Sequence, residues 1–131
     1  MADYYGIYRT NYFHVTDEEA YQKLIEGVKE VSDFEDFTKV ADDGSVLHGF
    51  GGDDTLVYDD GGDDEFYAAI QKLLPDGEAF IMVESGHEKL RYACGGVVVV
   101  TNKGIRSGSL ASMYSDFCQE LGITNYTEPS Y

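Results

Sequence analysis

The chain has 131 residues and carries 25 Asp and Glu against 9 Lys and Arg, which gives a formal net charge of −16 at pH 7. With 43% hydrophobic and 14% aromatic residues, this composition predicts one folded domain over residues 1–131 and excludes wholesale disorder. So negative a chain disfavours direct binding to nucleic acid or to anionic lipid, because both bind through Lys and Arg, and it predicts a basic protein surface as partner.

Neither a membrane span nor a cofactor site is indicated. No segment approaches the ~18 consecutive apolar residues of a spanning helix, and no basic stretch followed by an apolar run opens the chain, so we expect a soluble cytoplasmic protein. Cys94 and Cys118 are too few and too far apart for a structural zinc site or a redox Cys-x-x-Cys pair. Their positions predict buried thiols.

The first elements are a strand and a helix. Residues 5–15 alternate and are rich in aromatic and β-branched types, which predicts a strand. Thr16 and Glu19 fit a capping box that begins a helix. Its apolar residues recur at helical spacing and share one face; they are Ala20, Leu24, Ile25 and Val28.

A hairpin follows this helix. Residues 34–41 and 45–50 are predicted to form two strands joined by a turn at 42–45, where an Asp-Gly pair favours a tight reversal. A short strand is expected at 55–58.

A second helix is predicted after the acidic middle of the chain. Asp63 or Asp64 is its expected N-cap, and Pro, Asp and Gly at 75–77 stop it. Its expected inner face consists of Phe66, Ala69, Ile70, Leu73 and Leu74.

After the second predicted helix, the chain returns to the alternating pattern that is typical of strands. Strands are expected at 79–83, 90–94 and 96–101, and a turn at 102–104. The unbroken run of four valines at 97–100 predicts burial on both faces at the centre of the sheet.

The chain ends with a third predicted helix, which Ser109 caps and Gly122 terminates. Its expected buried face consists of Leu110, Met113, Phe117 and Leu121. The fold class that follows is α+β, an antiparallel sheet with about three helices packed mainly on one face. The order of the elements is compatible with two βαββ-like halves.

No sequence motif indicates a particular catalysed reaction. His14 and His48 lie in strand-like segments and His87 in a turn expected at 85–88, and none is placed by spacing beside a nucleophile, so each is interpreted as structural or exposed. The glycines form no phosphate-binding loop and the serines no nucleophile elbow. We therefore predict no catalytic residue, no metal site and no cofactor.

The most informative feature is the uneven distribution of charge. Residues 1–66 hold 18 acidic and 4 basic side chains, a net of −14, whereas residues 67–131 hold 7 and 5, a net of −2. Within residues 30–66, 13 acidic residues face a single basic one, Lys39. The predicted partner-binding residues are the acids of this segment that lie at turns, strand ends and a helix start: Asp42, Asp43, Asp53, Asp54, Asp59, Asp60, Asp63, Asp64 and Glu65.

Carboxylates on extended backbone resemble phosphates in their spacing. Alternate side chains of a strand stand about 6.6–6.8 Å apart, similar to successive phosphates along one DNA strand. This spacing predicts a protein that imitates nucleic acid and occupies a basic nucleic-acid-binding site, with fast, salt-sensitive association. The alternative is that the charge serves only solubility.

Two further interpretations stay open. Several tyrosines exceed what so small a core requires and predict a contact surface, in which case the chain is a protein-binding or immunity-type module that recognises one partner by shape; they are Tyr4, Tyr5, Tyr8, Tyr12, Tyr126 and Tyr131. A hydrolase that uses a carboxylate pair is the weaker interpretation. The acids at 53–65 do not match an EF-hand loop, which leaves only weak cation binding.

Two segments resemble a known group of proteins. Residues 10–19, TNYFHVTDEE, are similar to the opening of small acidic proteins carried on bacterial conjugative elements and phages. Residues 88–92, EKLRY, with Gly95-Gly96, the valine-rich strand and residues 109–114, resemble the second half of the same group. Together they cover under half of the chain and carry over no catalytic residue.

The resemblance implies a mobile-element setting, in which small acidic proteins often inhibit restriction or CRISPR systems. The expected function is accordingly a non-enzymatic inhibitor of the anti-CRISPR or anti-restriction type. Its partner is expected to be a basic nucleic-acid-binding protein such as a CRISPR effector or a restriction enzyme.

Overall fold

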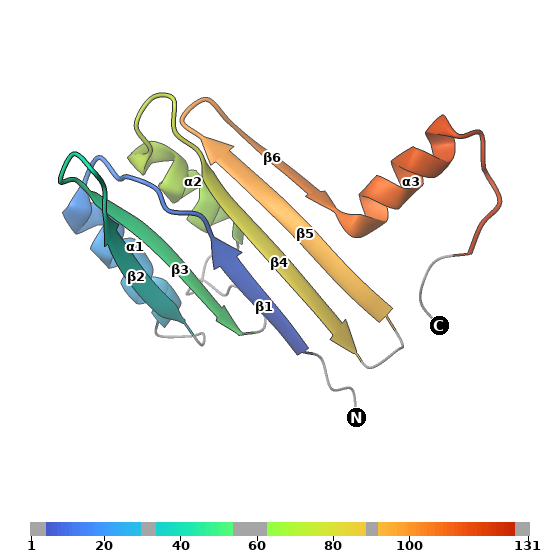
Figure 1. Ribbon diagram of the computed structural model, residues 1–131, viewed down its shortest axis with the longest axis horizontal. Coiled ribbons are helices and arrows are strands. Elements are labelled where there is room, and N and C mark those ends of the chain that lie inside the picture. Colours follow the sequence, from blue (N-terminus) through green and yellow to red (C-terminus); the bar gives the residue numbers. More distant parts are fainter. Residues whose placement is uncertain (1–4, 30–33, 54–62, 89–91, 128–131) are drawn as a thin grey trace.

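The computed structural model of the chain describes residues 5–29, 34–53, 63–88 and 92–127. Within these ranges lie six strands and three helices (Figure 1). In chain order they are β1 (Tyr5–Thr10), α1 (Glu18–Lys29), β2 (Glu35–Val40), β3 (Val46–Asp53), α2 (Asp63–Leu73), β4 (Phe80–Glu88), β5 (Tyr92–Thr101), β6 (Gly104–Ser109) and α3 (Leu110–Glu120).

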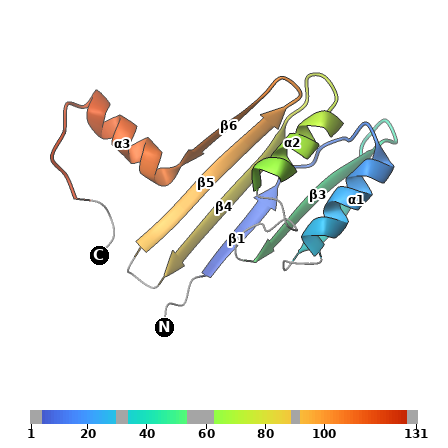
Figure 2. The ribbon, with the colours of Figure 1, turned by 180° about the vertical axis from the view of Figure 1, so that it is seen from behind.

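The strands form one antiparallel sheet in the order β2-β3-β1-β4-β5-β6. β1 lies near its centre, where Arg9 pairs with Gly51 of β3 on one side and with Val83 of β4 on the other. α1 and α2 cover the same face of the sheet (Figure 2), and no helix of the described residues covers the opposite, open face. The predicted α+β fold is confirmed.

The first four elements, β1-α1-β2-β3, form a βαββ unit. In the second half, the described residues run α2-β4-β5-β6, with no strand before the helix. The strand expected at 55–58 lies outside the described residues.

Aromatic rings form the centre of the core between the sheet and the two helices. The ring centroids of Phe13 and Phe80 lie 5.1 Å apart, and that of Phe50 lies 5.8 Å from those of Phe80 and Phe66. Contacts of this kind add about 0.5–1.5 kcal/mol per pair beyond the burial of the rings. The apolar faces predicted for α1 and α2 are confirmed, because both helices bury residues in this core: Leu24, Ile25, Val28, Phe66, Ile70 and Leu73. Leu74, which directly follows α2, is buried as well.

α1 is capped by Asp17, one residue later than expected. Oδ1 of Asp17 accepts a hydrogen bond from the backbone N–H of Ala20 at 3.1 Å, as an N-cap does. The cap expected at Thr16 is therefore wrong. The backbone N–H of Thr16 instead donates to the carbonyl of Leu73 at 2.8 Å, which ties the start of α1 to the end of α2.

β4 and β5 are longer than the sequence pattern predicts, because they pair without a break from end to end. The turn expected at 85–88 is wrong, since His87 pairs with Ala93 inside the sheet. β5 likewise passes through Gly95 and Gly96, where two strands were expected. Backbone partners on both β1 and β5 hold this part of β4 extended despite its turn-forming residues.

The valines at 97–100 are not buried on both faces. Val100 is fully buried, whereas Val97 is 36% exposed, because the helices cover only one face and successive strand residues point to opposite faces. The expected burial of the thiols is also wrong. Cys94 is exposed, since α2 lies over the far end of β5 (Figure 2), and Cys118 is half-buried.

The sequence pattern does not predict β6. Its residues include one large apolar side chain, Ile105, and the strand is held by backbone pairing with β5 along its whole length. Pairing of this kind depends on the neighbouring strand and leaves no periodic signal.

α3 begins and ends as predicted, but its apolar face is not buried. Ser109 caps it by accepting from the backbone N–H of Ser112 at 3.1 Å, and Gly122, with a φ of +77°, follows its end. None of the eleven residues of α3 is buried, so the buried face expected for this helix is wrong. β6 is an edge strand, so the chain leaves the sheet at Ser109 and α3 extends beyond the edge (Figure 1).

Gly51 is where β1 and β3 approach too closely for a side chain, since a Cβ atom there would lie 2.7 Å from the carbonyl oxygen of Tyr8. We expect Gly51→Ala to lower the free energy of unfolding by about 1–3 kcal/mol, measured by urea denaturation. Gly104→Ala is the matched control, because no atom lies within 4 Å of its added Cβ. Equal midpoints for the two variants would contradict this account of the sheet.

Candidate functional site at the acidic end of the sheet

Several connections meet at one end of the sheet (Figure 1), where β1, β2 and β5 finish and β3, β4 and β6 begin. Three of them, together with the first turn of α1, gather carboxylates from distant parts of the sequence. We call this group the acidic end; it consists of Asp17, Glu18, Glu19, Asp42, Asp43, Asp76 and Glu78. All are exposed except Glu78, which is half-buried.

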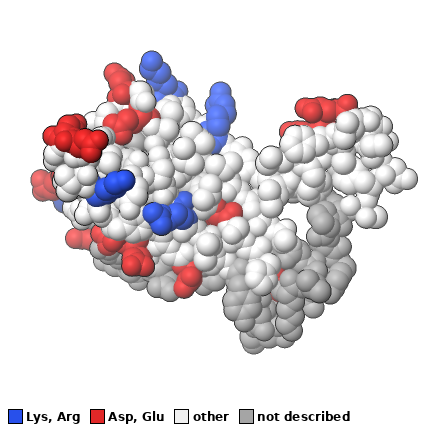
Figure 3. Space-filling model, in the orientation of Figure 1, with Lys and Arg blue, Asp and Glu red and all other residues white. Residues whose placement is uncertain are grey.

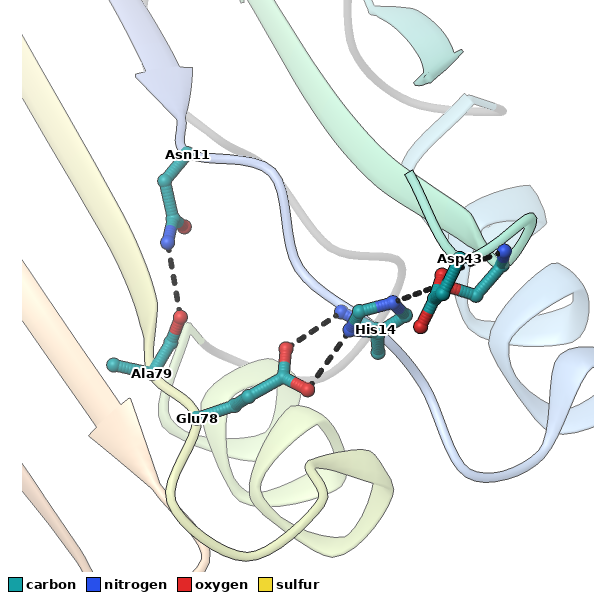
Figure 4. A network of polar contacts seen from close by, with 6 residues as sticks. Asn11, His14, Asp43, Glu78 and Ala79 are labelled. Atoms are coloured by element: carbon teal, nitrogen blue, oxygen red, sulfur yellow. Dashed lines mark hydrogen bonds and ion pairs between the residues drawn. The ribbon is translucent and has the colours of Figure 1, made fainter. Parts of the chain in front are cut away.

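His14 joins three of these connections (Figure 4). Its Nδ1 lies 2.8 Å from Oε2 of Glu78, and its backbone N–H donates to Oε1 of the same carboxylate at 3.1 Å. On the other side of the ring, Nε2 lies 2.7 Å from Oγ of Ser45. Ser45 in turn donates its hydroxyl and its backbone N–H to Oδ1 of Asp43, at 2.5 Å and 2.9 Å. The β1–α1, β2–β3 and α2–β4 connections are thus fixed to one another.

These hydrogen bonds place the ring of His14 between two acidic groups. Ser45 gives its hydroxyl proton to Asp43, and Nδ1 of His14 lies against the carboxylate of Glu78. The hydrogen bonds from Ser45 also lower the pKa of Asp43.

The trio Ser45, His14 and Glu78 has the residue types and distances of a hydrolase triad, but not its proton arrangement. In a triad, the base accepts the proton of the nucleophile. Here the Ser45 proton points to Asp43, and the adjacent carboxylate would repel the negative charge that develops during acyl transfer. In this arrangement the network links the three acidic connections to one another.

A second histidine ties the first turn of α1 to β3. Nε2 of His48, which is 5% exposed, lies 2.9 Å from both carboxylate oxygens of Glu18. The ring of His48 lies against that of Tyr21, with centroids 4.6 Å apart. Burial raises the pKa of Tyr21, and the carboxylates of Asp36 and Glu18 raise it further. The Tyr21 hydroxyl is buried and has no hydrogen-bond partner among the described residues.

The structure divides the predicted partner-binding residues between the two ends of the sheet. Asp42 and Asp43 are exposed in the β2–β3 turn, at the acidic end. Asp53 is exposed at the opposite end of β3, about 23 Å from Val46 along the strand at ~3.3 Å per residue. Three of the predicted residues lie outside the described residues: Asp54, Asp59 and Asp60.

The remaining predicted residues lie at the start of α2, of which Asp63 is the first residue; Asp64 and Glu65 are exposed. Glu65 lines a shallow groove of about 580 Å³ between α1 and α2, together with Lys23 and Lys72. Negative charge is thus mixed with positive charge on this face.

The described carboxylates do not form a row along one strand. On β2, alternate residues of one face are Glu35, Phe37 and Lys39, and Asp36 points to the other face. The 6.6–6.8 Å spacing of a single extended strand is therefore not the basis of any phosphate-like pattern here. The acidic end is an assembly of turns and a helix start instead.

Two cationic side chains of residues 1–66, the more acidic half of the sequence, lie over aromatic rings. The guanidinium carbon of Arg9 lies 4.3 Å from the ring centroid of Phe37, and Nζ of Lys39 lies 5.5 Å from that of Tyr12. The rings of Tyr12 and Phe37 meet edge to face at 5.5 Å. This cluster brings together β1, β2 and the residues after β1, which no local sequence pattern indicates.

Figure 3 shows the resulting distribution of charge. On the open face drawn there, carboxylates gather toward the side of β2 and β3 and are fewer over β5 and β6. Sequence reasoning missed Asp17, Glu18 and Glu19, whose signal was the acidic first turn of the predicted helix. Asp76 and Glu78 had no local signal, because only the antiparallel pairing of β1 with β4 brings them here.

The tyrosines predicted as contact residues are also divided. Tyr8 is 2% exposed and belongs to the core, whereas Tyr12 and Tyr126 are 37% and 40% exposed. Tyr4 and Tyr131 lie outside the described residues, and Tyr5 begins β1.

No group of three or more His, Cys, Asp and Glu side chains within the described ranges is placed to hold a metal ion. Among the helices described, none is long and apolar enough to cross a membrane. Comparisons of the chain with protein-family models, curated proteins and solved structures find no match.

Removing the Ser45 hydroxyl should raise the pKa of Asp43 toward its ordinary value of 3.8, because the largest cause of its lowering is the Ser45 side chain. A lowered carboxyl pKa stabilises the fold above the unfolded-state value, and this contribution is lost as the pH falls through the lowered value. We expect Ser45→Ala to lose part of this stabilising contribution. NMR titration of the Asp43 carboxyl measures the shift of its pKa, and Ser115→Ala, on α3, is the control. An unchanged Asp43 titration in Ser45→Ala would contradict the network.

Tyr21→Phe should raise the free energy of unfolding by about 1 kcal/mol, because it removes a buried hydroxyl that has no partner and keeps the ring contacts. The matched control is Tyr12→Phe at an exposed site, where a change within about 0.5 kcal/mol is expected. Urea denaturation monitored by circular dichroism measures both. A clear loss of stability in Tyr21→Phe would show that its hydroxyl is satisfied.

Proposed function

We propose that this chain is a non-enzymatic inhibitor that binds a basic nucleic-acid-binding protein through its acidic end and blocks the nucleic-acid site. The observation that carries the proposal is the gathering of seven carboxylates at one end of the sheet, three of which are positioned by histidines: Glu78 and, through Ser45, Asp43 by His14, and Glu18 by His48. Pre-ordered carboxylates lose little entropy on binding a Lys- or Arg-lined groove, and their field accelerates the encounter.

The setting of this inhibitor is proposed from the resemblance of residues 10–19 and 88–92 to small acidic proteins of mobile elements. A partner in restriction or CRISPR defence is consistent with this setting, since those systems act through basic nucleic-acid grooves. The proposed class is accordingly an anti-CRISPR or anti-restriction inhibitor.

Recognition by shape is the second candidate function, and the cation–aromatic cluster on the open face favours it. Arg9, Tyr12 and Phe37 are of types enriched in interface anchors, and Tyr12 is 37% exposed. Salt separates the two candidates, because charge-driven binding weakens steeply with ionic strength and apolar recognition does not.

The test is affinity capture of bacterial lysate proteins on the full chain at low salt, with elution by NaCl. Under the proposal, the captured protein is a nuclease or CRISPR effector that salt releases and that DNA or guide RNA displaces. Recovery only of a partner that resists salt, or of no partner, would contradict it.

The residues are tested by charge reversal at two acidic-end positions that make no described hydrogen bond. The double variant Glu19→Lys with Asp42→Lys should weaken binding to the captured partner by about tenfold or more. The control is Glu26→Lys with Glu35→Lys, both exposed and outside the acidic end, which changes the net charge equally. Calorimetric titration measures both, and equal losses would show that only the overall charge matters.

A further inference from the structure

The apolar stripe of α3 is an exposed surface that the acidic end does not explain. Leu110, Met113, Phe117 and Leu121 are separated by three, four and four residues, which places them on one side of the helix. They are 50%, 48%, 52% and 79% exposed. The stripe continues into the tail that follows the helix with Ile123 and Tyr126, which are 49% and 40% exposed.

A helix of this kind needs a surface to cover it. Isolated helices shorter than ~12–15 residues are marginal in water, and most helical stability in proteins comes from packing of the apolar face. α3 has eleven residues, none of them buried, and projects beyond β6 (Figure 1). Its stripe and its length therefore point to a partner outside this copy of the chain.

A hollow lies at the base of this helix. It has a volume of about 280 Å³ between the first turn of α3 and β5, and Leu110, Met113 and Val97 supply its apolar walls. Gly95 forms part of its floor, where an added Cβ would lie 3.0 Å from Cδ1 of Leu110. The hollow is therefore a socket for an apolar side chain.

The charge around α3 indicates which kind of partner can bind its apolar stripe. Residues 110–127 contain Asp116 and Glu120 and no Lys or Arg, so an anionic lipid surface would be repelled. A basic partner is attracted to the acidic end instead. Residues 67–131 carry a net charge of only −2, so this half is where a second copy of a −16 chain approaches with least repulsion.

The exposed area is of the size that a dimer needs. Two aromatic side chains of roughly 150–250 Å² each and four smaller aliphatic ones, all about half exposed or more, present on the order of 500 Å² per copy. Two copies would together bury about 1,000 Å², the least that a specific interface needs. A single self-complementary patch is sufficient for a two-fold dimer.

We propose that α3 is a homodimer interface, in which the stripes of two copies pack antiparallel across a two-fold axis. In this arrangement the end of each helix lies beside the start of the other. Leu121 and Ile123 of one copy then enter the socket of its partner. The acidic ends remain exposed, so the proposal goes beyond the proposed function and uses different residues.

Sedimentation equilibrium of the full chain is the test. The native chain is expected to have twice the monomer mass of 14.5 kDa, and Phe117→Glu with Leu121→Glu is expected to be monomeric. These variants should fold, because neither Phe117 nor Leu121 is buried within one copy, and circular dichroism checks this. Val40→Glu is the matched control, an exposed apolar residue on β2 that should leave the dimer intact.

Salt and hydrogen exchange give independent readouts. NaCl should strengthen the dimer, since it screens the repulsion between two acidic chains, whereas it weakens binding at the acidic end. Protection of the α3 amides should rise with protein concentration. A native chain that stays monomeric up to its solubility limit, or a double variant that still dimerises, would overturn the proposal without affecting the test of the acidic end.

Discussion

The antiparallel pairing of β1 with both β3 and β4 is the constraint on which the rest of the structure depends. It places the end of β1 beside the starts of two strands that are distant in sequence, and so brings three connections to one end of the sheet. The same pairing aligns Tyr8, Phe50, Phe80 and Met82 on the face that α1 and α2 cover. The core and the acidic end therefore both result from the antiparallel pairing of β1 with β3 and β4.

Electrostatic repulsion is the cost of that arrangement, and the histidines offset it. His14 lies between the carboxylate of Glu78 and the Ser45–Asp43 pair, and His48 contacts Glu18. Each therefore places a hydrogen-bond donor against a carboxylate where repulsion would otherwise open the loops. Glu78, Asp43 and Glu18 are therefore held in place at the exposed end of the sheet.

The helices divide the surface into parts with different properties. α1 and α2 bury one face of the sheet, while the open face and α3 keep large apolar side chains exposed, among them Ile7, Val83 and Phe117. Acid lies mainly on the side of β2 and β3, and apolar surface on the side of β5, β6 and α3. A chain organised in this way can carry two interactions with opposite responses to salt.

Local patterns in the chain were enough to predict the α+β class, the inner faces of α1 and α2, the 42–45 turn and the caps of α3, because periodicity and capping depend on residues close in sequence. The sequence did not determine β6 or the length of β4, since these depend on the backbone of neighbouring strands. It placed Asp42 and Asp43 in a turn. It predicted neither their link to Glu78 through His14 nor their separation from Asp53. Nor did the stripe of α3 indicate its exposure, because periodicity shows that a helix has an apolar face, and only the tertiary structure decides what covers it.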